Sequence, residues 1–177
     1  MGGDVVLPET VTTLPAQTFA YTKIRSFTGK GLRSIGDQAL RSCGSLERIE
    51  LGWDLDTLLG HECLNGTSNA KAVYWRGAPD PAKCTGNPPM GGWDWRVNGA
   101  TNYVPWDVRT KAPVQEWQDF AAAYNAEYGA LLDENGTAGL PTKRDAVGTL
   151  KHTGRGEKQY VAYWIPDLLP ATVIVVR

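Results

Sequence analysis

The sequence predicts an α+β fold, in which a short solenoid of repeats is followed by a helix and a small antiparallel sheet. Apolar residues recur at matched positions in units of 21–24 residues up to Trp75, a period typical of stacked repeats. The 20 glycines and 11 prolines among 177 residues indicate many turns and short elements. The last third combines one helical stripe of apolar residues with several strand-like runs.

One set of repeated segments contains a short apolar turn. It comprises Leu14–Phe19, Ile35–Leu40 and Leu59–Leu64, at offsets of 21 and 24 residues. A unit of this length cannot bury its own apolar side, so neighbouring units are expected to stack and share one core. The first residues of the three segments should therefore lie above one another, and so should the last residues. We expect a short turn of helix in each segment.

A second set of segments is typical of short strands. Ile24–Phe27, Leu46–Leu51 and Ala72–Trp75 follow the three turns at matched positions. One strand in each unit of about 20–29 residues is the pattern of leucine-rich repeats. The sequence therefore predicts a leucine-rich-repeat solenoid of about three units.

The segments Leu7–Phe19 and Leu32–Leu51 resemble BspA-like leucine-rich repeats. In that family, a Leu/Ile-Gly-x-x-Ala-Phe motif is followed by Asn or Ser, a Cys, a Ser-Leu pair and a strand that ends in proline. The residues that match here are Ile35, Gly36, Ala39, Leu40, Cys43, Ser45, Leu46 and Ile49. Two positions depart from the pattern, because Leu40 replaces the usual Phe and Gly52 stands in place of the proline.

The resemblance covers the chain from about Val5 to Phe120 and is closest up to Leu51. It implies a bacterial or protist adhesion module, located outside the cell or at the cell surface. The N-terminal residues of this chain lack the basic start and apolar core of a signal peptide. The location is therefore implied by the resemblance alone.

The patterns divide the chain into three segments. Residues 5–77 carry the repeats, residues 78–112 form a Pro/Gly/Trp-rich loop and a closing strand, and residues 113–177 form a helix and a three-stranded sheet. The helix is predicted over 113–132 from apolar residues at steps of three and four. These residues are Trp117, Phe120, Tyr124, Tyr128 and Leu131. The three strands are predicted at Val147–His152, Gln159–Ile165 and Ala171–Val176.

Charge and cysteine content exclude several classes of protein. With 18 basic and 19 acidic residues, the chain lacks the positive field of a nucleic-acid or anionic-membrane binder. No apolar run is long enough to insert into a membrane. The three cysteines form no Cys-x-x-Cys pair, and neither histidine has ligand spacing to them, so we expect no disulfide framework, metal site or cofactor. Cys43 is expected to be buried and Cys84 exposed.

No catalytic motif occurs in the sequence. A Gly-x-Ser-x-Gly elbow, a phosphate-binding loop and a dinucleotide-binding glycine motif are all missing, so we expect the protein not to be an enzyme. Two alternatives stay open. The first is an enzyme whose C-terminal half carries catalysis, and the second is a structural assembly subunit of a virion or cell-surface lattice.

Tryptophans in and after the long loop are the predicted binding residues. Trp93 and Trp95, with Asp94 and Arg96 beside them, lie in the Pro/Gly-rich stretch, and Trp106 follows it. Rigid aromatic rings flanked by polar groups are typical of surfaces that bind proteins or carbohydrates. The alternative is that Trp93 and Trp95 cap the end of the repeats. The predicted function is a non-catalytic binding or adhesion module that recognises a protein or glycan through an extended surface.

Overall fold

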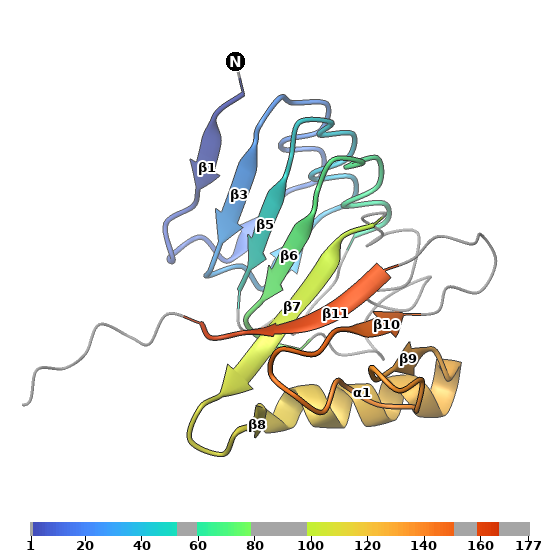
Figure 1. Cartoon of the computed structure of the whole chain (residues 1–177). Helices are drawn as coiled ribbons and strands as arrows, with labels where there is room; N and C mark the ends of the chain where they lie inside the picture. The colour runs from blue at the N-terminus through green and yellow to red at the C-terminus, as the bar shows by residue number, and fades with distance from the viewer. Residues whose placement is uncertain (1, 53–59, 79–98, 151–158, 167–177) are drawn as a thin grey trace, which may run out of the picture.

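The computed structural model describes residues 2–52, 60–78, 99–150 and 159–166. In this part of the chain, nine strands form one mixed sheet, and a two-stranded ladder and a single helix lie beside it (Figure 1). The elements are β1 (Asp4–Val6), β2 (Thr13–Leu14), β3 (Ser26–Gly29), β4 (Ser34–Ile35), β5 (Arg48–Leu51), β6 (Ala72–Trp75), β7 (Thr101–Asp107), β8 (Ala112–Pro113), α1 (Gln115–Tyr128), β9 (Leu131–Leu132), β10 (Gly148–Leu150) and β11 (Gln159–Trp164). The sheet order is β1-β3-β5-β6-β7-β11-β10-β9, and β8 pairs with β7.

The repeat units are neighbours in space, as their sequence alignment predicts. Strands β1, β3, β5 and β6 pair in parallel, and their register places Phe27, Ile49 and Val73 in one row. In the β2–β4 ladder, Leu14 lies opposite Ile35. Their equivalent Leu59 lies outside the described residues. Each unit therefore adds one strand to the large sheet and packs on the unit before it.

The apolar segments around Phe19, Leu40 and Leu64 are turns, so the predicted helical turns are wrong. Each segment contains two residues with positive φ, four positions apart, and a left-handed residue cannot continue a right-handed helix. The backbone instead bonds to the next unit, as where the Phe19 N–H donates to the Ala39 carbonyl (2.8 Å). The positive-φ residues are Gln17, Tyr21, Gln38, Ser42, Glu62 and Gly66.

The predicted fold class is wrong. The described chain does not divide into a solenoid and a separate α+β part. Instead, β7 pairs in parallel with β6 on one edge and with β11 on the other, so repeat strands and C-terminal strands belong to one sheet. The described chain is mostly β and contains a single short helix. The segments 5–77, 78–112 and 113–177 all contribute strands to this sheet.

A buried amide in β7 links the repeat strands to the C-terminal strands. Asn102 is 4% exposed, and a buried amide is stable only when its polar atoms have partners. Its Oδ1 accepts a hydrogen bond from Trp75 Nε1 in β6 (3.0 Å), and its Nδ2 donates to the Tyr160 carbonyl in β11 (3.4 Å). These partners are 27 and 58 positions away in the sequence, a separation that local periodicity does not reveal.

The C-terminal helix is confirmed, although it is shorter than predicted. Trp117, Phe120 and Tyr124 are its buried stripe. The helix ends at Tyr128 and is capped by Gly129, whose φ of 57° is left-handed and whose N–H donates to the Asn125 carbonyl (2.9 Å). Glycine adopts this conformation without steric cost. Leu131, expected as the last helical residue, therefore lies in β9.

The two C-terminal strands nearest the helix are also confirmed. The prediction at Val147–His152 corresponds to β10, and that at Gln159–Ile165 corresponds to β11. They pair antiparallel, with Gly148 opposite Val161. The predicted third strand, Ala171–Val176, lies outside the described residues.

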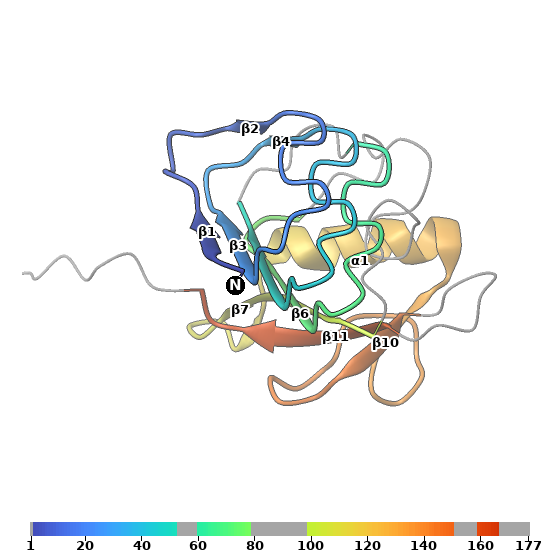
Figure 2. The same ribbon diagram turned by 90° about the horizontal axis from the view of Figure 1, so that it is seen from above.

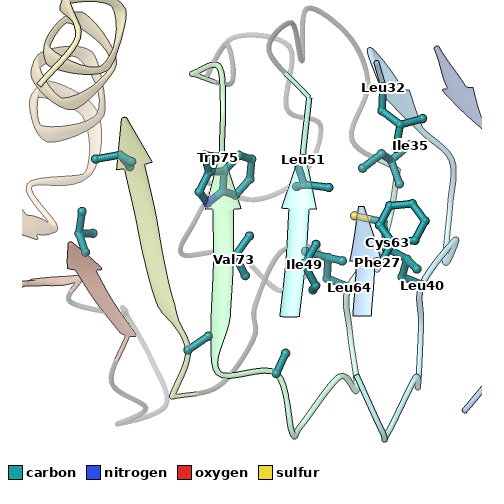
Figure 3. Packing of buried hydrophobic residues seen from close by; sticks show 14 of the residues in the cluster. Phe27, Leu32, Ile35, Leu40, Ile49, Leu51, Cys63, Leu64, Val73 and Trp75 are labelled. Atoms are coloured by element: carbon teal, nitrogen blue, oxygen red, sulfur yellow. The ribbon is translucent and has the colours of Figure 1, made fainter. Parts of the chain in front are cut away.

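Apolar side chains of strands and turns meet in one core. Phe27, Ile49 and Val73 extend from adjacent strands to the side where Leu40 and Leu64 lie (Figure 3). The core continues under the helix, because the Trp75 and Trp117 rings lie 6.0 Å apart, edge to face. The predicted burial of Cys43 is confirmed, and Cys63 is equally buried. Cys84 lies outside the described residues.

Gly36 lies at a close approach between two units, and its replacement should test that contact. An added Cβ would lie 2.5 Å from the Ala16 N atom and 2.9 Å from its Cα. Because both are backbone atoms, Gly36→Ala is expected to lower the free energy of unfolding by about 1–3 kcal/mol through overpacking. Urea unfolding measures this change, and Gly44→Ala is the control, since nothing lies within 4 Å of its added Cβ. Equal losses in the two variants would contradict the close packing.

Candidate functional site

Other elements of the described chain cover one side of the sheet, and the opposite side carries a cluster of aromatic and arginine side chains. β2, β4 and α1 lie on the same side of the sheet (Figure 2). Successive side chains of a strand point to opposite sides, so the neighbours of buried Ile49, Val73 and Asn102 point away from these elements. Three of these outward side chains and Trp164 of β11, whose register with β7 places it on the same side as Tyr103, form a cluster that we call the open face. It comprises Arg48, Tyr74, Tyr103 and Trp164.

The open face is a stacked array. The Tyr74 and Tyr103 rings are 4.7 Å apart and nearly parallel, with an interplanar angle of 9°. The Arg48 guanidinium lies 3.8 Å from the centre of the Tyr74 ring, within the range of a cation–π interaction. The Trp164 ring meets Tyr74 edge to face at 5.0 Å. Each ring therefore limits the movement of the next.

Trp164 reaches across β7 to join this array. It belongs to β11, yet its Nε1 donates a hydrogen bond to the Trp75 carbonyl in β6 (2.9 Å). The strand between them contributes Pro105 opposite Trp164, and proline has no N–H to compete for that carbonyl. The indole is consequently held by both packing and a hydrogen bond.

An ion pair is buried beneath the array. Glu50 and Arg76 are 6% and 5% exposed. Arg76 Nε donates to Glu50 Oε1 (2.8 Å), and Arg76 Nη2 lies 2.7 Å from the same oxygen. The other carboxylate oxygen of Glu50 accepts from Arg48 Nη2 (3.4 Å). The carboxylate thus connects the buried guanidinium to the exposed one, which positions Arg48 over the Tyr74 ring.

Comparison with known proteins gives no match to any family model, curated protein or solved structure. The functional assignment therefore depends on the geometry of the site. Among the described residues, no helix is long and apolar enough to cross a membrane. In the same part of the chain, no group of three His, Cys, Asp or Glu side chains could hold a metal ion.

The structure places one predicted binding residue, and it is not on the open face. Trp93, Asp94, Trp95 and Arg96 lie outside the described residues. Trp106 belongs to β7, on the side of the sheet that α1 covers, and lines a cavity of about 400 Å³. The Trp106 ring also lies 4.8 Å from the Tyr163 ring. The predicted residues are therefore not shown to form one site.

Tyr163 closes the inner side of this region. Its hydroxyl donates to the Pro141 carbonyl (2.5 Å), and Pro141 lines the cavity. Burial raises the pKa of Tyr163 above its ordinary value, and the nearby Glu134 carboxylate raises it further. The hydroxyl is therefore protonated at neutral pH and remains a donor to the backbone.

Sequence reasoning missed the residues of the open face. Alternation along the strands could have indicated which side these residues face. Tyr74 lies between buried Val73 and Trp75. Tyr103 lies between buried Asn102 and Val104. Alternation shows that two tyrosines share a side of the sheet. It does not show that their strands are neighbours, because β6 and β7 are separated by residues 76–100 in the sequence.

Proposed function

We propose that this protein is a non-catalytic recognition module that binds a protein partner through the open face. The observation that supports this proposal is the array of Arg48, Tyr74, Tyr103 and Trp164 on the side of the sheet that α1 does not cover. Tyrosine, tryptophan and arginine are the residue types enriched at the energetic centres of protein interfaces. An adhesion role at a cell surface, which the BspA-like resemblance implies, is part of this proposal.

The stacking geometry favours a protein over a glycan. Sugars bind tyrosine and tryptophan mainly through a free ring face. Strands β5 and β7 flank β6, so Arg48 and Tyr103 occupy both faces of the Tyr74 ring. Around Tyr74, the array therefore offers hydroxyl groups, a ring edge and a guanidinium in place of a free ring face, which suits the mixed polar and apolar surface of a protein.

The array is also pre-organised, and this favours recognition by a rigid surface. The buried Glu50–Arg76 pair and the indole hydrogen bond of Trp164 restrict the side chains before any partner arrives. Side chains that are already ordered lose less conformational entropy on binding. We therefore expect the open face to contribute to affinity without rearrangement of the sheet.

Replacing Tyr103 should separate binding from folding. Tyr103 is partly exposed and stacks on Tyr74, so Tyr103→Ala should lower the melting temperature only modestly. It should weaken partner binding by about 2 kcal/mol or more. Proteins captured from cells by the wild type are first compared with those captured by the variant. A protein lost in the variant is then purified and titrated by calorimetry.

Tyr21→Ala is the matched control, because Tyr21 is an exposed tyrosine (69%) outside the open face. It should capture and bind the same partner as the wild type. Equal affinity of Tyr103→Ala and Tyr21→Ala for that partner would refute the open face as the binding surface. Binding to a glycan array that depends on Tyr103 would show that the ligand class is wrong.

A further inference from the structure

The cavity beside Trp106 is a separate feature that the proposed function does not use. It lies between β8, the helix α1 and residues 138–142, and its volume is about 400 Å³, which is within the usual range for small-molecule sites. Most of its lining is apolar, including the Trp106 indole and the small side chains of Ala121 and Ala122. The cavity therefore suits a compact ligand with a flat or branched hydrocarbon body.

The single charged side chain among the residues that line this cavity is Lys111. In the described part of the chain, the ion pairs involve other cations, namely Arg25, Arg41, Arg48 and Arg76. The positive charge of Lys111 thus has no carboxylate partner among these residues. Lys111 is exposed and supplies the one charge among the lining residues, which favours a ligand with one negative charge.

The backbone of Lys111 has an unusual conformation. Its φ is 54°, in the left-handed region, although the turn between β7 and β8 could hold glycine or asparagine there at lower cost. The turn is fixed by Asp107, whose Oδ1 accepts from the Arg109 N–H (2.7 Å), and this bond lowers the pKa of Asp107. The Lys111 side chain is therefore presented from a well-anchored turn.

Thr142 and two amide side chains are the uncharged polar residues that line the cavity, and the Thr142 hydroxyl already donates to the Glu134 carboxylate. Asn125 Oδ1 accepts a hydrogen bond from the Leu131 N–H (2.8 Å), which leaves Nδ2 as the group able to donate to a ligand. Gln118 Nε2 donates to the Pro113 carbonyl (2.8 Å), which leaves Oε1 as an acceptor. An ammonium group and an amide N–H on one cavity are complementary to the two oxygens of a carboxylate.

We propose that this cavity binds a small organic monocarboxylate with an apolar ring or short hydrocarbon body. Lys111 and Asn125 hold the carboxylate, and Trp106 and the alanines contact the body. The site lies on the side of the sheet opposite the open face. A test of this ligand site is therefore independent of a test of the proposed protein recognition.

The probes are phenylacetate and its neutral isostere phenylacetamide, titrated into the full chain by calorimetry and by amide chemical shifts. Phenylacetate should bind and shift the signals of residues 106–125, and phenylacetamide should bind about tenfold more weakly because it lacks the charge. Equal binding of the two probes, or no binding of phenylacetate, benzoate and hexanoate at millimolar concentrations, would overturn the proposal.

Substitution of Lys111 tests its role in ligand binding with a variant that is expected to remain folded. Lys111→Gly removes the charge and relieves the left-handed backbone, so it should weaken phenylacetate binding about tenfold while the melting temperature stays equal or rises. Lys111→Arg should retain binding, and Arg109→Gln is the control on the same turn, because Arg109 does not line the cavity. Unchanged phenylacetate affinity in Lys111→Gly would also overturn the proposal.

Asn125→Asp provides a second, independent variant. The aspartate keeps an oxygen to accept the Leu131 N–H, so the helix end should remain intact. It replaces the donor Nδ2 by a negatively charged oxygen, which repels a carboxylate. Phenylacetate binding should therefore be lost, and its retention at wild-type affinity would contradict the placement of the carboxylate.

Discussion

Glu50→Ala is expected to lower the free energy of unfolding by about 3–5 kcal/mol. The substitution removes the carboxylate that accepts from Arg76 Nε and Arg48 Nη2. Arg76 is 5% exposed, so its charge would remain in a poorly solvated position without its principal counter-ion. An uncompensated buried charge is among the most destabilising results of a single substitution. Urea unfolding followed by tryptophan fluorescence measures the change.

A double variant distinguishes the ion pair from simple packing. Glu50→Leu combined with Arg76→Met removes both charges and keeps most of the volume, so it should recover most of the stability lost in Glu50→Ala. Asp4→Ala is the control for an exposed pair, since Asp4 and Arg25 are 3.9 Å apart and both largely exposed, and it should lose little. A double variant as unstable as Glu50→Ala would show that the charge is not the cause.

Ile35→Ala is expected to cost about 2–5 kcal/mol. Ile35 is fully buried, lies opposite Leu14 in the β2–β4 ladder and accepts the Gly60 N–H at its carbonyl (2.7 Å). Its side chain packs between two units that are held together by backbone hydrogen bonds, so the cavity left by truncation cannot collapse freely. Chemical denaturation gives the magnitude.

Val6→Ala is the matched control for this truncation, because Val6 is an aliphatic residue on the edge strand β1 with 72% of its surface exposed. Its effect should stay within about 0.5 kcal/mol. Losses of similar size in Ile35→Ala and Val6→Ala would mean that Ile35 is not part of the core. This outcome would also remove the basis for aligning the units at Leu14 and Ile35.

The sequence by itself determined which residues of neighbouring units meet. Leu14 and Ile35 recur in the same position of their units and pair in the structure. Contacts between successive units join residues 21–24 positions apart, so a periodic apolar pattern contains them directly. The same holds for α1, whose buried Trp117 and Phe120 are close in sequence and follow the helical period.

The left-handed conformation at two turn positions could not be predicted, because neither position holds the glycine or asparagine that usually indicates it. Gln17 and Gln38 adopt φ values of 57°, where glycine or asparagine is the common choice. Stacking makes these positions tolerable, since the Gln17 Nε2 donates to Gln38 Oε1 (3.2 Å) and backbone bonds link the units. Those partners come from the next unit and are not visible in the local sequence. The local pattern therefore predicted a turn of helix.

Only the tertiary structure decided that the repeat strands and the C-terminal strands share one sheet, and where the candidate sites lie. Asn102 joins β6 to β11 through partners far apart in the chain, and the same pairing brings Trp164 to Tyr74. Alternation within a strand indicates the side to which each residue points, whereas the choice of neighbouring strand depends on packing between distant segments. That is why the sequence could identify a buried core yet could not predict the open face or the position of Trp106.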